Sequence, residues 1–324
     1  MGSGSNAENA PTRKLRPQSM LFTLWGDYVI HRGGIIGSRS LISIGEQFGL
    51  SEPALRSSLA RMSRAGWLQR QRSGRRSFYS LSPAGRHLLN QGTRRIFRRP
   101  RDSWDGRWHI VGYSVPEEQR GLRDALRKRL SYLGFGQLPS GTWISPHDLR
   151  SEVDELVVEL GAETHVEHFR GAYAGPLDDR ALASRAWDLQ TLAHAYQGFI
   201  SRWLPLSSRL ESGVTLEPPR AFVQRFLVIH EYRRFFFTDP DLPSLLLHPQ
   251  WPASRAAELF ESVHERLTGP AEAFFTAAYL DGHQFAADAS LRARSGARPA
   301  TTSGDRAPDN QQPEHLGRSG QSPA

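Results

Sequence analysis

The sequence predicts an α+β chain of several domains, and three observations support this fold class. The first third combines helical apolar spacing with a basic, glycine-centred hairpin. The middle alternates strand-like and helical segments, and the following region predicts helices separated by proline-containing loops. Both ends are rich in polar residues, glycine and proline, and we expect them to be disordered. The predicted segments are an arm at 1–17, domains at 18–100, 101–175 and 176–285, and a tail at 286–324.

Charge is divided unevenly along the chain. Residues 1–101 hold 18 Lys and Arg against 4 Asp and Glu, a net charge of +14, whereas the whole chain carries +8. Such a concentration of positive charge favours a nucleic-acid phosphate backbone as the partner. A solvated basic face, or a surface that binds an anionic membrane, would have a similar composition. The absence of cysteine excludes disulfides and thiolate metal sites. No apolar run of about 20 residues and no signal peptide is present, which predicts a cytoplasmic protein without a membrane partner.

Three helices are predicted in the first folded domain. Apolar residues at helical spacing begin at Ser19 and stop at Gly33-Gly34. A second helix fits residues 38–48, with Ser38 or Ser40 as its N-cap, and a third begins after Ser51, another N-cap residue, and ends before Gly66.

The third helix separates an apolar face from a basic face. Leu55, Leu59 and Met62 recur at i, i+4 and i+7 and should face the core. We expect the opposite face to lack acidic partners four residues away, which distinguishes it from an ordinary solvated face. The side chains predicted to contact base edges in DNA are Arg56, Ser57, Arg61 and Arg64.

A basic hairpin follows this helix. WLQRQR and SFYSLS predict two strands, joined by the turn SGRR at 73–76. A basic hairpin after a basic helix is typical of a winged helix-turn-helix, in which the helix enters the major groove and the wing contacts phosphates or the minor groove. Small folds of this kind also act as protein-interaction modules, an alternative that stays open. The residues predicted to contact the DNA backbone are Arg72, Arg75 and Arg76.

Several separated stretches, in order, give the chain a specific resemblance. They are GDYVIHRGG at 26–34, the basic segment 50–86, WDGRWHIVGYSVPE at 104–117, LGFGQLPSGTWISPHD at 133–148 and HEYRRFFFTDPDLPSLLLHPQWPASRAAELF at 230–260. Together they resemble the PaaX family, bacterial repressors of phenylacetic acid catabolism, over roughly residues 17–285. The resemblance implies a ferredoxin-like central domain and an aryl acyl-CoA effector, phenylacetyl-CoA being the best-known case.

The central domain has a predicted order of strand, helix, two short strands, helix and strand, which matches a ferredoxin-like unit. That fold hosts many functions and names none. His165 and His168 lie on its last predicted strand, where an odd spacing places them on opposite faces and argues against a metal pair.

The C-terminal domain has a predicted central helix, FVQRFLVIHEYRRFFF, that is apolar nearly all round yet carries charged groups. These groups form either a satisfied core network or part of a site for an anionic ligand. Trp143 of the central domain either stacks on a ligand ring or closes that domain's core. The residues that we predict to bind the acyl-CoA effector are Trp143, His230, Arg233 and Arg234.

Catalytic motifs for nucleotide, serine hydrolase or zinc protease chemistry are absent from the sequence. A metal-dependent nuclease with Asp102 and Asp105 as ligands, or a non-catalytic nucleic-acid-binding protein, is the alternative. We expect instead a regulator without a catalytic site, metal or cofactor, in which a homodimer binds a partly palindromic double-stranded operator. An effector would release it by binding one conformation of the dimer more tightly than the other.

Overall fold

The computed structural model describes residues 15–96 and 104–283. Residues 1–14 of the predicted arm and the predicted tail from 286 lie outside these residues, while Pro17 of the arm begins the first helix. The described chain is an α+β fold with two small sheets, in which all neighbouring strands are antiparallel. Of the described helices, none is both long and apolar enough to cross a membrane.

The N-terminal region begins with one continuous helical segment that changes type along its length. Helix α1, Pro17–Leu24, continues as the π-helix η1, Trp25–Val29, and the 3₁₀ turn η2, Ile30–Arg32. It ends at Gly33, whose φ of 80° a side chain would strain. Strand β1, Ile35–Gly37, was not predicted, because three residues are too few to show alternation.

Helices α2, Ser38–Glu46, and α3, Glu52–Arg64, follow, and they cross closely. A Cβ atom on Gly45 would lie 2.3 Å from Cδ1 of the fully buried Leu55, so any larger residue here would displace that side chain. The prediction of a serine cap for α2 was wrong, since the helix begins at Ser38 and its N-cap is Gly37. Ser51 is the N-cap of α3, although its side chain makes no capping hydrogen bond.

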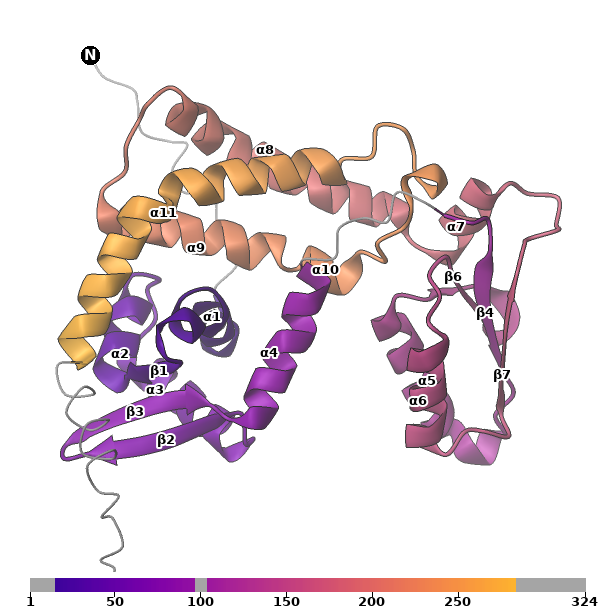
Figure 1. Cartoon of the computed structure of the whole chain (residues 1–324), viewed down its shortest axis with the longest axis horizontal. Helices are drawn as coiled ribbons and strands as arrows, with labels where there is room; N and C mark the ends of the chain where they lie inside the picture. Colours follow the sequence, from indigo (N-terminus) through magenta and orange to yellow (C-terminus); the bar gives the residue numbers. More distant parts are fainter. Residues whose placement is uncertain (1–14, 97–103, 284–324) are drawn as a thin grey trace, which may run out of the picture. The chain divides into compact units, whose positions relative to one another are not determined.

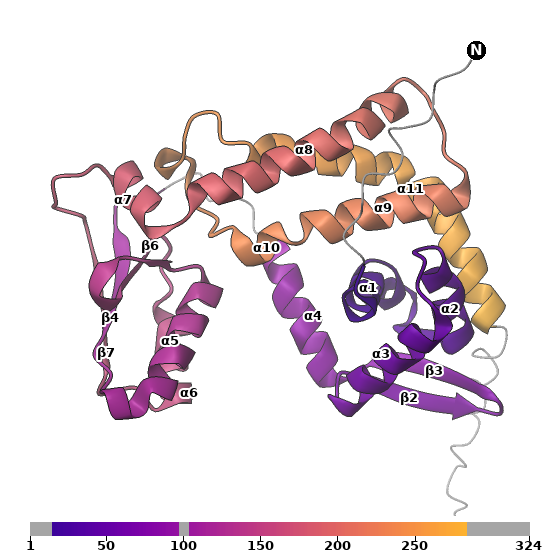
Figure 2. The ribbon, with the colours of Figure 1, turned by 180° about the vertical axis from the view of Figure 1, so that it is seen from behind.

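The hairpin consists of β2, Leu68–Ser73, and β3, Arg76–Leu81, around Gly74. It pairs with β1 to give a sheet of order β1-β3-β2, and α4, Pro83–Ile96, comes next. Helix α3 contacts β2, and Figures 1 and 2 show the hairpin lying along the lower side of the short N-terminal helices.

The central region forms the second sheet, of order β5-β6-β4-β7. Helices α5 and α6 cover one face, where Val111 and Trp143 join their apolar residues, whereas Trp108 and Ile144 pack on the other face with α7 and residues 242–247. The elements are β4 (Trp108–Tyr113), η3 (Glu117–Gln119), α5 (Arg120–Leu133), β5 (Gly136–Gln137), η4 (Pro139–Gly141), β6 (Thr142–Ser145), α6 (Arg150–Leu160) and β7 (Val166–Gly171).

The C-terminal region is helical, as its pattern predicted. Its elements are α7 (Asp179–Ala186), α8 (Leu189–Glu211), α9 (Pro218–Tyr232), α10 (Phe235–Thr238), η5 (Ser244–Leu246) and α11 (Ala253–His283).

Helix α9 takes part in two apolar cores. Phe222 and Phe226 belong to the core of the N-terminal helices and hairpin, together with Phe275 of α11. Ala221 and Val228 belong to a second core with α8 and α11. All five side chains are fully buried. The apolar core of the N-terminal region is therefore completed by residues about two hundred positions later in the chain.

Candidate nucleic-acid interface and ligand site

All of the side chains predicted to contact DNA are exposed. On α3, burial of Leu55, Leu59 and Met62 fixes the helix rotation and turns the opposite face to solvent. The remaining predicted contacts lie at the end of the hairpin, where residues 72–76 of β2, the turn and β3 are all exposed. The exposed residues are Arg56, Ser57, Arg61, Arg64, Arg72, Arg75 and Arg76.

These arginines differ in their contacts within the protein. Arg56 forms an ion pair of 2.6 Å with Glu52, so our expectation of no acidic partner at i±4 was wrong. Arg61 donates a hydrogen bond of 2.9 Å from Nη1 to Oγ of Ser57, which directs its guanidinium along the exposed face. Within the described residues, Arg64, Arg72 and Arg75 make no hydrogen bond or ion pair.

Sequence reasoning missed Arg70 on β2. This exposed residue lies two positions before Arg72, so both side chains project from the same side of the strand. Its Nη2 donates a hydrogen bond of 2.8 Å to Oγ of Ser77 on β3. The alternation of arginine in the segment RQR was the signal that could have identified it.

The predicted effector residues do not line one common cavity. Trp143 lines a cavity of about 260 Å³ between the central sheet region and the segment that follows α9. Its indole N–H is buried without a hydrogen-bond partner in the described part of the chain. The other lining residues are Ser131, Gly134, Phe135, Gln137, Ala186, Trp187, Asp188, Phe237, Thr238, Asp239 and Pro240.

His230 and Arg233 contact helix α1 instead. Nδ1 of His230 lies 2.9 Å from Oγ1 of Thr23, and Nη2 of Arg233 donates to Oγ of Ser19 at 2.7 Å. Burial, and to a lesser extent the neighbouring Arg233 and Arg234, lower the pKa of His230 to about 4, so the ring is neutral near pH 7. Arg234 is exposed, directly before α10.

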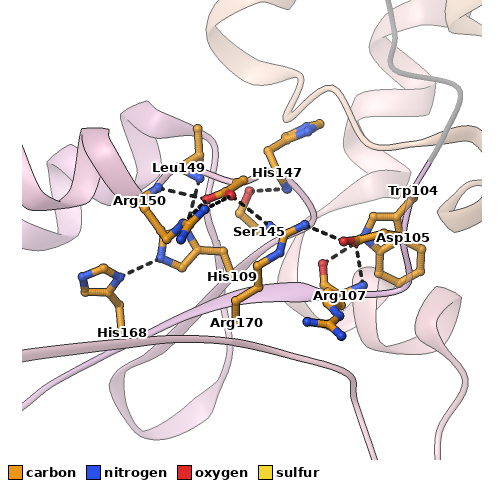
Figure 3. A network of polar contacts seen from close by, with 11 residues as sticks. Trp104, Asp105, Arg107, His109, Ser145, His147, Leu149, Arg150, His168 and Arg170 are labelled. Carbon is orange, nitrogen blue, oxygen red and sulfur yellow. Dashed lines mark hydrogen bonds and ion pairs between the residues drawn. The ribbon is translucent and has the colours of Figure 1, made fainter.

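A polar network joins β4 and β7 to the segments that precede β4 and follow β6 (Figure 3). Nη2 of Arg170 donates to Oδ2 of Asp105 at 2.8 Å, and this hydrogen bond lowers the pKa of the Asp105 carboxyl. Asp105, a candidate nuclease ligand, is thus occupied by an arginine, and Asp102 lies outside the described residues. In the part of the chain that the structure describes, no group of three or more His, Asp or Glu side chains could hold a metal ion.

The histidines of this region form a directed chain of hydrogen bonds. Nδ1 of His109 accepts from the backbone N–H of Leu149 at 3.3 Å, so its Nε2 carries the proton and donates to Nδ1 of His168 at 3.1 Å. His168 then donates from Nε2 to Oδ1 of Asp154 at 3.0 Å. His165 bonds elsewhere, to the carbonyl oxygen of Ser114. His165 and His168 therefore have different hydrogen-bond partners and do not form a pair.

Comparison with known proteins identifies the family of this chain. Three family models match in order: a PaaX-like protein model at residues 16–85, the PaaX protein central Cas2-like domain at 101–183 and the PaaX-like protein C-terminal domain at 187–277. The chain belongs to the PaaX family. Transcriptional repressor PaaX of Escherichia coli K12 is 35% identical over 260 residues, which cover 79% of this chain and 82% of the repressor.

A solved structure also resembles this PaaX-family chain. It is an uncharacterized protein from Mycobacterium tuberculosis, 25% identical, with a TM-score of 0.53 over 80% of this chain and 97% of the other. A named relative that represses transcription makes this a family of regulators and not of enzymes, so no catalytic role is assigned to any residue.

Proposed function

We propose that this protein is a DNA-binding transcriptional repressor whose N-terminal region contacts the operator. One observation carries the proposal: the basic side chains of α3 and of the hairpin are exposed together, within the segment that matches the PaaX-like model. An arginine with no protein partner is available to neutralise a phosphate or to reach a base edge, and each neutralised phosphate releases counterions.

We further propose that this region is a winged helix-turn-helix. Helix α3 lies in the major groove as the recognition helix and the β2–β3 hairpin contacts the backbone as the wing. The central region is a ferredoxin-like domain, a proposal supported by its order of strands and helices and by its four-stranded antiparallel sheet. A homodimer would present two recognition helices to half-sites of a partly palindromic operator, about one helical turn apart or a multiple of it.

A gel-shift titration with two variants tests the DNA contacts. The specific probe is a duplex selected in vitro with the wild-type protein, and the non-specific probe is a duplex of random sequence. Arg61→Ala should weaken specific binding and relax sequence preference, whereas Arg75→Ala should weaken binding to both probes and reduce its salt dependence. Arg255→Ala is the matched control, since Arg255 is exposed on α11 and pairs only with Glu258 among the contacts described. Titrations of Arg61→Ala and Arg75→Ala that both match the wild type would contradict the proposal.

The cavity beside Trp143 is the proposed effector site. Four of its lining residues are aromatic, which suits an aryl ring, and one of them is Trp143, whose buried N–H has no hydrogen-bond partner among the described residues. Its lining includes no arginine or lysine, so the acyl and aryl part of an acyl-CoA fits here better than the diphosphate. Arg234, exposed at the start of α10, is the proposed diphosphate contact.

Thermal unfolding in the presence of phenylacetyl-CoA, coenzyme A alone and phenylacetate tests this site. A ligand at about 100 times its Kd stabilises the folded state by about 2.7 kcal/mol, which is readily measured as a shift of Tm. Phenylacetyl-CoA should raise Tm more than either part alone, and Trp143→Phe should reduce the shift. Trp104→Phe, outside this cavity, is the control. No shift with any thioester would contradict an acyl-CoA effector and leave the DNA-binding proposal intact.

A further inference from the structure

One face of helix α9 is devoted to the N-terminal region. Phe222, Arg225, Phe226, His230 and Arg233 follow one another at helical spacing, and each contacts α1, η1 or the turn after α2. The opposite face packs into the second core with α8 and α11. Helix α9 is therefore fixed between the predicted DNA-binding region and the rest of the C-terminal helices.

Apolar contacts link α9 directly to the turn before the recognition helix. Phe48 lies in the turn between α2 and α3, and its ring centroid is 4.5 Å from that of Phe226 and 5.9 Å from that of Phe222. Gly49, the next residue, has a φ of 68° and sets the direction in which the chain enters α3. A displacement of α9 therefore acts on the turn that orients α3.

A buried charged cluster closes the same interface. Nη1 of Arg225 donates to Oδ2 of Asp27 at 2.5 Å, and Nη2 donates to Nε2 of His264 at 2.6 Å. The guanidinium also lies 4.9 Å from the ring centre of Tyr28 and donates from Nε to Thr268. Only 4% of Arg225 is exposed. The cluster thus joins η1, α9 and α11.

The charges in this cluster depend on one another. Burial alone would lower the pKa of Arg225, but the carboxylate of Asp27 and the hydroxyl of Tyr28 raise it overall. Because arginine is only a donor, Nε2 of His264 is the acceptor in its contact with Arg225. Asp27 lies within the π-helix η1, a local widening of the helix that often marks a functional position. No residue of the cluster is among the predicted DNA contacts.

We infer that Arg225 is a positioning residue, which holds the recognition helix α3 in its DNA-binding orientation by fixing α9 against η1 and the Phe48 turn. The inference rests on the proposed function. It extends that function, because α9 leads at its C-terminal end into α10 and residues 237–240, which line the proposed effector cavity. Helix α9 contacts the N-terminal region along one face, and after a turn at residues 233–234 the chain continues into the segment that lines the proposed effector cavity.

Hydrogen exchange of the full-length chain, without DNA, tests the structural part. In Arg225→Met, exchange should accelerate at least tenfold in residues 47–64 as well as in η1 and α9, while residues 108–171 exchange as in the wild type. Arg255→Met, the exposed control on α11, should change none of these segments. Acceleration confined to η1 and α9, with 47–64 unchanged, would overturn the inference.

A binding assay tests the positioning role. Arg225→Met should bind the duplex selected with the wild-type protein at least tenfold more weakly, yet bind a random duplex within about threefold, because the phosphate-contacting arginines are still present. Arg225→Lys, which keeps the charge but not the paired donors, should recover part of the specific affinity. Specific binding within twofold of the wild type would overturn the inference.

The two proposals can fail separately. If the wild type binds no duplex, the proposed function fails, and the exchange data still decide whether Arg225 controls α3. If Arg225→Met does not fold, Phe226→Leu replaces it, since that change loosens the Phe48 contact and leaves the charged cluster in place. The same exchange and binding pattern is expected of Phe226→Leu, and its absence would overturn the inference.

Discussion

The arginines of the α3 and hairpin surface contrast with those of helix α9. Arg64, Arg72 and Arg75 are exposed and bond to no described residue, whereas Arg225 and Arg233 are bonded to side chains of the N-terminal region. The residue type is the same in both regions, but burial differs. A buried guanidinium must be paired because desolvation is costly, while an exposed one keeps its charge free for a ligand. Buried positive charge therefore serves the fold, whereas exposed positive charge is available to a ligand.

Removing a buried arginine should have the largest effect and would test the interior side of this contrast. Arg225→Leu leaves the carboxylate of Asp27, which is 19% exposed, without its partner. We expect the free energy of unfolding to fall by about 3 kcal/mol in urea denaturation. Arg255→Leu, whose partner is exposed, should cost less than about 0.5 kcal/mol. Equal effects of the two changes would remove the distinction drawn between the regions.

Removing an exposed arginine should spare stability and affect DNA. For Arg61→Ala we expect a loss of about 1–3 kcal/mol in binding to the selected duplex, measured by titration at fixed salt, with unfolding unchanged. For Arg75→Ala we expect the salt dependence to fall by about one phosphate contact. A loss of folding stability in either variant would show that these side chains serve the fold.

The buried histidines should make the interior sensitive to acid. Burial first, and then nearby positive groups, lower the pKa of His109 and of His230 to about 4. Between about pH 6.5 and pH 4 the unfolded chain takes up these protons and the folded chain does not. The free energy of unfolding therefore decreases as the pH is lowered through this range. We expect a loss of about 1–2 kcal/mol per histidine between about pH 7 and pH 5.

The variant His230→Gln isolates one of these contributions. Its loss of stability on acidification should be smaller than that of the wild type, because glutamine does not titrate. His194→Gln, on the exposed surface of α8, is the control and should behave as the wild type does. An identical acid response in the two variants would contradict a neutral, buried His230.

The smallest effect is expected from an acidic residue on the exposed face of α3. Glu52 pairs with Arg56 on the exposed face of α3, and in the proposed complex its carboxylate would repel a DNA phosphate. Glu52→Gln should therefore strengthen binding to a random duplex by about twofold at low salt, since exposed helix pairs contribute only about 0.3–0.5 kcal/mol. Weaker binding would show that Glu52 orients Arg56 for its contact.

Much of the local structure could be predicted from the sequence. Periodicity placed Leu55, Leu59 and Met62 in the core and the arginines of α3 outside, and the alternating segments around Gly74 predicted the hairpin. The role of these arginines in binding DNA stays a prediction. Glu52 was overlooked although its spacing from Arg56 was visible in the sequence.

The contacts between distant segments were not predictable in this way. Asp27 and Arg225 are 198 positions apart, and the charge of each was visible without any sign that they pair. The same holds for Thr23 with His230, and for the cavity that brings Trp143 next to residues 237–240.

The sequence by itself determined which faces of its helices and strands are apolar, because periodicity and capping act within a few residues of the chain. Only the tertiary structure decided which charges are buried and paired. That outcome depends on which segments meet: helices α9 and α11 complete the core of the N-terminal region and bring Arg225 to Asp27. Desolvation then requires this arginine to bond within the protein, while those of α3 and the hairpin stay in water.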